Sequence, residues 1–219
     1  MSAKTTVVLG GGVGGLVAAN ELRRLLSREH RVFLVERNLQ HAFAPSFLWL
    51  MIGDRQGPEI TRDLRTLVRP GVEVMEAEAL ATKPADHQVE TTRGLLHYDY
   101  LIVALGAELA PEGIPDLACS SHTFFTLDGA AKLREALSSF SGGRVAIVIT
   151  ALPYKCPAAP HEGAMLVADF FRKKGIRDKV DLHLFTPESQ PLPVAAPSLA
   201  KRFARYSKQR ASRFIHRTS

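Results

Sequence analysis

The glycines in Gly10-Gly-Gly-Val-Gly-Gly15 have the spacing of a phosphate-binding loop. Gly10, Gly12 and Gly15 fit G-x-G-x-x-G, between an apolar, β-branched run at residues 5–9 and a run with helical periodicity. In such a loop the first glycine permits a tight turn, the second lets a pyrophosphate approach the main chain, and the third lets helix and strand pack closely. The N–H groups that begin the helix then face the phosphates. This segment therefore predicts a dinucleotide-binding βαβ unit.

An acidic residue stands where the adenosine ribose of such a dinucleotide is expected. Glu36 ends a second apolar run, residues 31–35, and a carboxylate at that place can accept hydrogen bonds from ribose hydroxyls. Arg37 could pair with a 2′-phosphate, but the neighbouring carboxylate opposes this, so FAD or NAD is preferred to NADP. A glycine-rich tight turn that holds no nucleotide is the alternative.

Cys156 is the second candidate for chemistry. It lies in Pro153-Tyr-Lys-Cys-Pro-Ala-Ala-Pro160, which follows the apolar run 145–149, where a second dinucleotide fold would place its glycines. Prolines lack the N–H donors that a phosphate needs, so this loop is not expected to hold a nucleotide. The start of the next helix and the neighbouring Lys155 both favour a thiolate, which predicts a reactive cysteine with a lowered pKa. A buried, inert cysteine is the alternative.

The other cysteine, Cys119, lies in a polar segment and forms no C-x-x-C motif. We expect a free surface thiol there, with a redox partner as the alternative. Two separated cysteines and scattered histidines do not make a zinc set, so no metal site is expected. No Ser-His-Asp arrangement is suggested either.

The elements that position these groups alternate between strand and helix patterns. The sequence predicts an α/β fold: a Rossmann-like βαβ unit with a β-meander, followed by a second, degenerate Rossmann-like unit. We expect domain boundaries at 1–110 and 111–200, with a basic tail at 201–219 that is disordered or aberrant. Beyond the first unit, the expected strands are 72–77, 88–92, 95–103, 145–149 and 179–185, and the expected helices are 58–68, 127–140 and 161–174.

Composition and charge exclude several classes of protein. The 219 residues, 46% hydrophobic and 23% charged, are typical of a globular protein and exclude collagen, coiled coils and wholesale disorder. The apolar runs are shorter than the roughly 18 residues of a membrane helix, and the first residues lack the pattern of a signal peptide. The net charge of +6 comes from the tail that begins at Lys201 and has no acidic residue. Nucleic-acid binding is therefore not expected.

Together these segments resemble the sulfide:quinone oxidoreductases and the related flavoprotein subunit of flavocytochrome c sulfide dehydrogenase. The resemblance extends from the first strand to about residue 210. Its most specific part is the P-Y-K-C-P-A-A-P sequence around Cys156. The other segments that carry it are Leu9 to Gly15, Glu36-Arg37, Phe43 to Trp49 and Tyr98 to Ala107.

The resemblance implies FAD as the cofactor and sulfide and quinone as the substrates. It implies that Cys156 is the redox cysteine that carries sulfur beside the flavin, with Glu162 as a candidate for proton transfer. Full-length members are peripheral membrane proteins, so a cytoplasmic or peripheral membrane location is implied, and a homo-oligomer is one possible assembly. The positions that would bind FAD are Gly10, Gly12, Gly14, Gly15, Glu36, Arg37, Ala42, Pro45, Ala77 and Gly106.

The sequence also departs from the family pattern. Phe125 stands where members with three functional cysteines have one of them, and Leu105 replaces a threonine in the turn before Gly106. The segments that would form the C-terminal half, with a second redox cysteine, are missing, so we expect a C-terminally truncated member. Two alternatives remain: a catalytically inactive dinucleotide-binding module and an NADH-linked flavin reductase.

Overall fold

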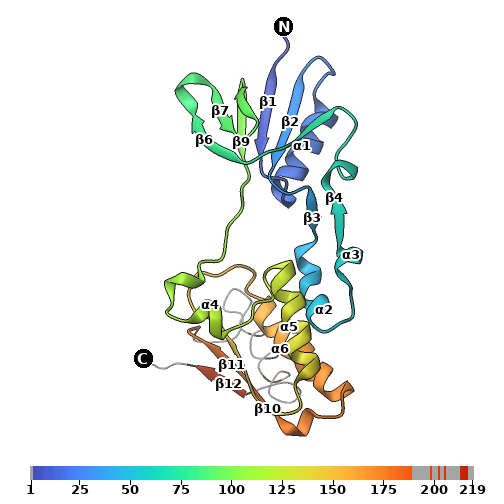
Figure 1. Cartoon of the computed structure of the whole chain (residues 1–219), viewed down its shortest axis with the longest axis vertical. Coiled ribbons are helices and arrows are strands. Elements are labelled where there is room, and N and C mark those ends of the chain that lie inside the picture. The colour runs from blue at the N-terminus through green and yellow to red at the C-terminus, as the bar shows by residue number, and fades with distance from the viewer. Residues whose placement is uncertain (1, 189–197, 199–201, 203–204, 206–212, 217–219) are drawn as a thin grey trace. The chain divides into compact units, whose positions relative to one another are not determined.

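The structure is a computed structural model of the 219-residue chain, and it describes residues 2–188, 198, 202, 205 and 213–216. The chain divides into two compact units. The first unit comprises residues 1–43 and 58–121, and the second comprises residues 44–57 and 122–219. The short segment 44–57 therefore interrupts the first unit in sequence and packs with the second (Figure 1).

A four-stranded parallel sheet, in the order β5-β2-β1-β9, forms the centre of the first unit. Leu9, at the end of β1, pairs with Val35 of β2 on one side and with Val103 of β9 on the other. This arrangement confirms the predicted βαβ unit. Its elements are β1 (Thr5–Leu9), α1 (Val13–Leu25), β2 (Arg31–Glu36), β5 (Val72–Glu76) and β9 (Tyr100–Val103).

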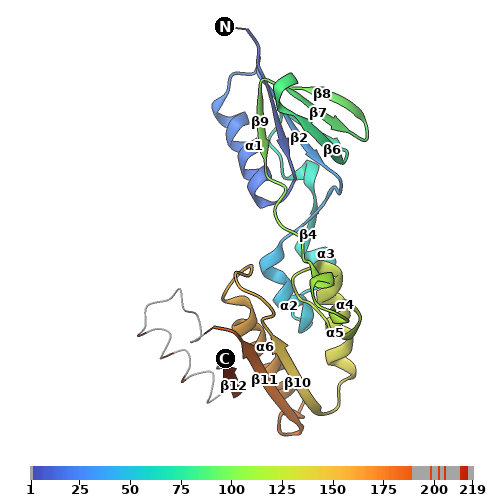
Figure 2. The same cartoon turned by 90° about the vertical axis from the view of Figure 1, so that its left-hand side faces the viewer.

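Both faces of this sheet are covered, as the buried strands of a parallel sheet require. Val8 and Leu34 face α1, in a cluster with Ala19, whereas Leu9 and Val35 belong to a second cluster on the other face. That second face is covered by an antiparallel meander; Figure 2 shows α1 on one side of the sheet and the meander on the other. The sequence predicted a meander, but its expected first strand, 72–77, is β5 of the parallel sheet. The strands of the meander are β6 (Ala79–Lys83), β7 (Gln88–Thr91) and β8 (Gly94–His97).

The predicted single strand 95–103 is wrong, because the chain changes sheets within it. Strand β8 ends at His97 and β9 begins at Tyr100. Between them, the carboxylate of Asp99 accepts hydrogen bonds from the Thr5 amide and the Lys4 ammonium group, at 2.8 and 2.7 Å. These bonds anchor the start of β9 to the start of β1. Apolar periodicity alone does not reveal such a break.

The predicted helix 58–68 is also wrong except for its first turn. The segment contains α3 (Gly57–Ile60), β4 (Thr61–Asp63) and a 3-10 turn, η2 (Leu64–Thr66). Strand β4 pairs with β3 (Gln40–Ala42) in an antiparallel ribbon. The side chain of Asp63 accepts a hydrogen bond from the Arg65 amide and caps the 3-10 turn. Pairing with a distant strand therefore overrides the local helical spacing.

The second unit is built on a parallel sheet in the order β10-β11-β12, which confirms the second Rossmann-like unit. Helix α6 packs against β10 and β11, and α2 packs against α5 and α6 (Figure 1). Helix α5 is capped by the Thr126 hydroxyl, which accepts a hydrogen bond from the Gly129 amide. The bounds are α2 (Phe47–Met51), α5 (Leu127–Ser139), β10 (Gly143–Val148), α6 (Ala159–Lys173), β11 (Val180–Thr186) and β12 (Arg213–His216).

Strand β12 lies in the basic tail, whose residues other than 202, 205 and 213–216 are outside the described part of the chain. The remaining short elements are α4 (Leu117–Ser120) and the 3-10 turns η1 (Ala44–Ser46), η3 (Pro84–Asp86), η4 (Pro111–Gly113) and η5 (Arg177–Lys179). Within the described residues, no helix is both long and apolar enough to cross a membrane.

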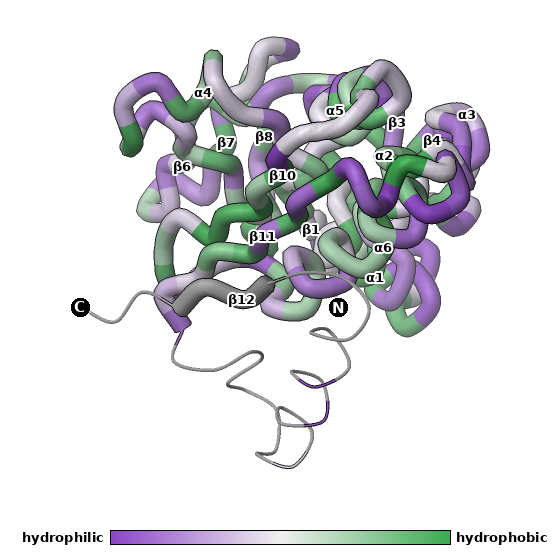
Figure 3. The backbone as a smooth tube through the Cα atoms, turned by 90° about the horizontal axis from the view of Figure 1, so that it is seen from below, coloured by the Kyte–Doolittle hydropathy of each residue, from purple (hydrophilic) through white to green (hydrophobic). Residues whose placement is uncertain are grey.

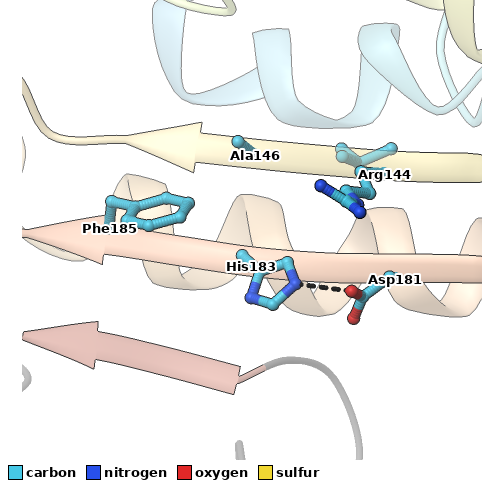
Figure 4. Close-up of a pocket in the computed structure, with 6 residues that line it drawn as sticks. Arg144, Ala146, Asp181, His183 and Phe185 are labelled. Atoms are coloured by element: carbon cyan, nitrogen blue, oxygen red, sulfur yellow. Dashed lines mark ion pairs between the residues drawn. The ribbon is translucent and has the colours of Figure 1, made fainter.

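The two faces of the β10-β11 pair differ. Residues of β11 alternate between buried positions such as Leu182 and more exposed positions such as Asp181. Most of β10 is hydrophobic (Figure 3). On one face, Arg144, His183 and Phe185 contribute to the lining of a hollow of about 410 Å³, where the imidazole of His183 lies 2.8 Å from the carboxylate of Asp181 (Figure 4). The part of the chain that the structure describes places no meander over this sheet.

Candidate functional site

The glycine loop between β1 and α1 depends on close main-chain contacts. Gly10 has a φ of +96°, in the left-handed region, and a Cβ atom there would lie 2.5 Å from the carbonyl oxygen of Ala104. A Cβ atom on Gly15 would lie 1.8 Å from the carbonyl oxygen of Gly10. Neither contact is possible for a side chain, so both glycines are needed to bring α1 against the sheet.

The outer side of the same loop is open. A Cβ atom on Gly12 would meet no heavy atom within 4 Å, and one on Gly14 would only reach the Ala104 side chain at 3.9 Å. Gly12 is the N-cap of α1 and supplies no side-chain hydrogen bond, and the first turn of α1 has no acidic residue. On the side of Gly12 and Gly14, the positive end of the helix therefore faces open space. A pyrophosphate fits this arrangement.

Glu36 lies at the end of β2 and is bonded to the same loop. Its Oε2 atom accepts a hydrogen bond of 2.6 Å from the Gly11 amide, and its Oε1 atom accepts one of 3.0 Å from the Asn38 amide. Each carboxylate oxygen has a second lone pair, so the group can still accept a ribose hydroxyl. The structure therefore brings Glu36 and the glycine loop together, as the sequence predicted for a dinucleotide site.

Arg37 is exposed and directed toward other carboxylates. Its guanidinium lies 2.7 Å from Glu108 and 3.9 Å from Glu78. The hydrogen bond with Glu108, followed by the negative charges of Glu108 and Glu78, raises the pKa of Arg37. With two acids beside it, Arg37 is a weak partner for a 2′-phosphate. This agrees with the preference for FAD or NAD over NADP.

The other positions implied by the family resemblance lie at several places. Ala42 ends β3 in the first unit, and Pro45 lies in η1 of the second unit. Ala77 is buried in the core beneath the meander, where its amide donates to the carbonyl of Glu36. Gly106, just after β9, has a φ of +74° and open space on its Cβ side. Their contacts with a cofactor stay predictions.

Cys156 lies in the loop between β10 and α6 and is an exposed, free thiol. Its φ of +56° is in the left-handed region, which is uncommon for a residue with a side chain. Its carbonyl accepts a hydrogen bond from the Ala159 amide, at 3.0 Å, so the residue forms the turn that leads into α6. Glu162 is exposed on the first turn of that helix. The candidate redox cysteine, Cys156, and the candidate for proton transfer, Glu162, therefore both lie at the N-terminal end of α6.

Cys119 is also exposed, in α4 of the first unit, and its thiol lies 3.2 Å from the carbonyl oxygen of Asp116. Phe125 stacks on Phe124, with the Lys155 ammonium group 5.9 Å from its ring centre. Within the described residues, no three His, Cys, Asp or Glu side chains are grouped as metal ligands.

The sequence did not reveal a buried polar cluster beside the Cys156 loop. It contains Tyr154 of that loop, His161 of α6 and Glu188, which follows β11. The hydroxyl of Tyr154 lies 3.0 Å from Oε1 of Glu188, and Nε2 of His161 lies 3.8 Å from Oε2. The side chains of His161 and Glu188 are only 1% and 4% exposed. His161 follows the apolar residues Pro157 to Pro160, but Glu188 stands among Thr186, Ser189 and Gln190, so no sequence signal pointed to its burial.

Comparison with known proteins gives two matches to family models. Residues 4–150 match the pyridine nucleotide-disulphide oxidoreductase family. Residues 130–185 match the central region of the flavoprotein chain of flavocytochrome c sulfide dehydrogenase. The second match contains Cys156 and the loop around it.

Individual relatives agree with these matches. The mitochondrial sulfide:quinone oxidoreductase of Dictyostelium discoideum is 30% identical over 202 residues, and the match covers 86% of this chain and 43% of that protein. The sulfide-quinone reductase of Aquifex aeolicus is 30% identical over 191 residues, with 85% and 44% covered. The crystal structure of the sulfide:quinone oxidoreductase from Aquifex aeolicus superposes with a TM-score of 0.85 at 26% identity, covering 98% of this chain and 51% of that one.

The chain thus spans about half the length of these relatives. The family model covers most of its residues, and the structure places Glu36 beside the glycine loop. The chain belongs to the pyridine nucleotide-disulphide oxidoreductase family of FAD-binding flavoproteins, and sulfide:quinone oxidoreductases are among its relatives in that family.

Proposed function

We propose that this chain provides the FAD-binding and cysteine-bearing part of an oxidoreductase that oxidises sulfide and passes the electrons to a quinone. The observation that carries the proposal is the exposed thiol of Cys156 in a loop without glycine, at the point where β10 leads into α6. This loop lies in the segment that resembles a sulfide dehydrogenase flavoprotein.

The first unit would hold the cofactor. Gly10 and Gly15 set the loop, the open side at Gly12 and Gly14 would receive the pyrophosphate, and Glu36 would bind the ribose. The assignment of Arg37, Ala42, Pro45, Ala77 and Gly106 to the same cofactor rests on the family resemblance. When bound, FAD would accept the electron pair removed from sulfur.

The second unit would carry the sulfur. A thiol and a sulfide that join as a persulfide form one S–S bond and release two electrons and two protons. The loop exposes Cys156, so a small anion such as hydrosulfide can approach it. Glu162, exposed on the first turn of α6, is the proposed proton acceptor.

The test is anaerobic addition of sulfide to the FAD-loaded protein, with the visible flavin absorbance as the readout. We expect bleaching in the wild type and its loss in Cys156→Ser. The matched control is Cys119→Ser, which removes the other exposed thiol and should leave bleaching intact. Full bleaching in the Cys156→Ser variant would show that the thiol is not the sulfur carrier.

The same assay separates the alternatives. Bleaching by NADH instead of sulfide would identify an NADH-linked flavin reductase. The loop after β10 does not favour that result, because Pro157 and Pro160 supply no N–H groups for a second nucleotide. A protein that binds FAD but responds to neither donor would be an inactive dinucleotide-binding module.

A further inference from the structure

The phenol of Tyr154 connects the loop that carries Cys156 to the body of the second unit. The hydroxyl of Tyr154 lies 3.0 Å from Oε1 of Glu188 and 3.2 Å from the carbonyl oxygen of Pro157. Tyr154 and Pro157 flank Cys156 in the sequence, whereas Glu188 follows β11. The hydroxyl therefore joins the two sides of the cysteine turn to the end of a buried strand.

The Tyr154 hydroxyl is the hydrogen-bond donor in this contact. A phenol has one proton, but both neighbours of the Tyr154 oxygen are acceptors. The hydroxyl donates its proton to one of these two oxygens at a time, and both lie within hydrogen-bond distance. In either arrangement, removing the phenol oxygen leaves a buried carboxyl group and a loop carbonyl without this partner, which is unfavourable.

Glu188 is itself held in place by its surroundings. Its amide donates a hydrogen bond of 3.1 Å to the hydroxyl oxygen of Thr186, and that hydroxyl lies 3.3 Å from the Oε2 atom of Glu188. His161 is buried in the first turn of α6, and its Nε2 atom lies 3.8 Å from the same Oε2 atom of Glu188. Glu188 is therefore a fixed anchor and not a mobile surface carboxylate.

The turn at Cys156 needs such an anchor. A residue with a side chain at a φ of +56° is less stable there than glycine, because its Cβ atom crowds the main chain. The conformation persists only if surrounding contacts hold it. The hydrogen bond from the Ala159 amide to the Cys156 carbonyl is one such contact, and the hydrogen bond of the Tyr154 hydroxyl to Glu188 is another, which reaches outside the turn.

We propose that Tyr154 and Glu188 are positioning residues that hold Cys156 in its left-handed conformation and so fix the orientation of the thiol. The proposal rests on the proposed function in one respect, which is that Cys156 is the reactive sulfur. The contacts of Tyr154 and Glu188 on which it is based involve neither flavin nor sulfide.

The main test is hydrogen exchange of the Ala159 amide, measured by NMR on the full chain. Tyr154→Phe removes one oxygen and keeps the ring, and we expect it to increase exchange of this amide about threefold to tenfold, the effect of one hydrogen bond. In the double variant Tyr154→Phe, Cys156→Gly, the Ala159 amide should again be protected from exchange, because glycine adopts the left-handed conformation without steric cost. A Tyr154 that acts only by packing would not be rescued by a glycine two residues away.

The second test measures the thiol itself. Iodoacetamide modifies both exposed cysteines in one sample, so the ratio of the rates at Cys156 and Cys119, measured at one fixed pH, cancels the reagent concentration. We expect this ratio to change about threefold or more in Tyr154→Phe and in Glu188→Ala, since each loses one hydrogen bond. Glu188→Gln keeps an oxygen that accepts from Tyr154 and should retain the wild-type ratio. Circular dichroism checks that each variant is folded.

An unchanged Ala159 amide and an unchanged ratio in Tyr154→Phe would overturn the proposal, as would failure of Cys156→Gly to restore protection. A Glu188→Gln variant that behaves like Glu188→Ala would overturn the role of the hydrogen bond. Neither measurement uses sulfide or FAD. Failure of sulfide to bleach the flavin would therefore refute the proposed function and leave this inference standing.

Discussion

The amide of Gly11 donates a 2.6 Å hydrogen bond to the Oε2 atom of Glu36, so the acid that ends β2 also shapes the loop that ends β1. The sequence shows the glycine loop and the ribose-binding acid as two separate motifs. In the structure they are one unit, because the carboxylate fixes the main chain that would surround the pyrophosphate. Changes at Glu36 should therefore affect the whole nucleotide site.

This relationship predicts the effect of substitutions at Glu36 on FAD binding. Glu36→Ala removes both the acceptor for Gly11 and the ribose contact, and we expect the Kd for FAD to rise about tenfold to 100-fold, since hydrogen bonds to charged groups contribute ~1.5–3 kcal/mol. Glu36→Gln keeps an oxygen for Gly11 and should have a smaller effect. Flavin fluorescence quenching measures the Kd.

Glu73→Gln is the matched control for those variants, because Glu73 forms an exposed ion pair with Arg31 on the same sheet. Exposed pairs contribute little, so FAD binding should not change. Equal Kd values for Glu36→Ala and the control would contradict the assignment of Glu36 to the nucleotide site.

The two kinds of glycine in the loop predict two different phenotypes. Gly15→Ala places a methyl group against the Gly10 carbonyl, and we expect the free energy of unfolding to decrease by about 1–3 kcal/mol. Each kcal/mol should lower the Tm by roughly 2–4 °C. Gly12→Ala meets no atom, so the Tm of the FAD-free protein should stay near that of the wild type while FAD binding weakens.

The measurement for these glycine variants is thermal unfolding without FAD, followed by FAD titration of each folded variant. Gly113→Ala, another position with open space, is the control that should change neither property. A Gly12→Ala protein with undiminished FAD affinity would show that the pyrophosphate does not approach this side of the loop.

Burial of His161 predicts a pH dependence of stability. Burial lowers the pKa of this imidazole below its ordinary value of 6.5, while the negative charge of Glu188 acts in the opposite direction. The unfolded chain then binds the proton at a higher pH than the folded protein does. The contribution is fully present above pH 6.5 and is lost as the pH decreases toward the lower, folded pKa.

Chemical unfolding between about pH 8 and pH 5.5, above the range in which ordinary carboxylates titrate, tests this expectation. The free energy of unfolding of the wild type should decrease across this range, and the decrease should be smaller in His161→Gln. His122→Gln, at an exposed position of the same unit, should keep the wild-type slope. A slope that is identical in all three proteins would mean that His161 does not titrate abnormally.

Tyr154 should ionise later than an ordinary phenol. Burial, then the hydrogen bond and the negative charge of Glu188, raise its pKa far above the usual value of 10.0. In an ultraviolet titration of tyrosinate up to about pH 11, one unit above the reference pKa, Tyr154→Phe should therefore leave the absorbance change of the folded protein unaltered. Tyr100→Phe, which removes a solvent-exposed phenol, is the comparison variant. A smaller absorbance change in Tyr154→Phe would show that the phenol is accessible.

The sequence predicted those features that depend on local pattern. Thr5–Leu9 and Arg31–Glu36 are continuous apolar strands because both faces of the parallel sheet are buried, and the glycine spacing reflects steric contacts within a few residues. The prediction of a helix over 58–68 was wrong, because the pairing of β4 with β3, which are distant in the sequence, decides the conformation of this segment.

The polar cluster around Cys156 could not be predicted for a related reason. A glutamate after an apolar strand normally faces solvent, and only the packing of the loop, α6 and β11 buries Glu188 beside Tyr154 and His161. The sequence indicated the nucleophile, whereas its supporting residues emerged from tertiary structure.

The pairing of β1 with β9 has a consequence for how the protein is made. Residues at the start of the chain, such as Thr6, pair with residues near position 100, such as Tyr100. During synthesis the outer edge of β1 stays unpaired until β9 has left the ribosome, and such long-range parallel pairing forms slowly. Segment 44–57 emerges within this interval and has its packing partners in the later unit. A nascent chain paused before residue 100 therefore exposes an apolar strand edge, and chaperones that bind such edges should associate with it there.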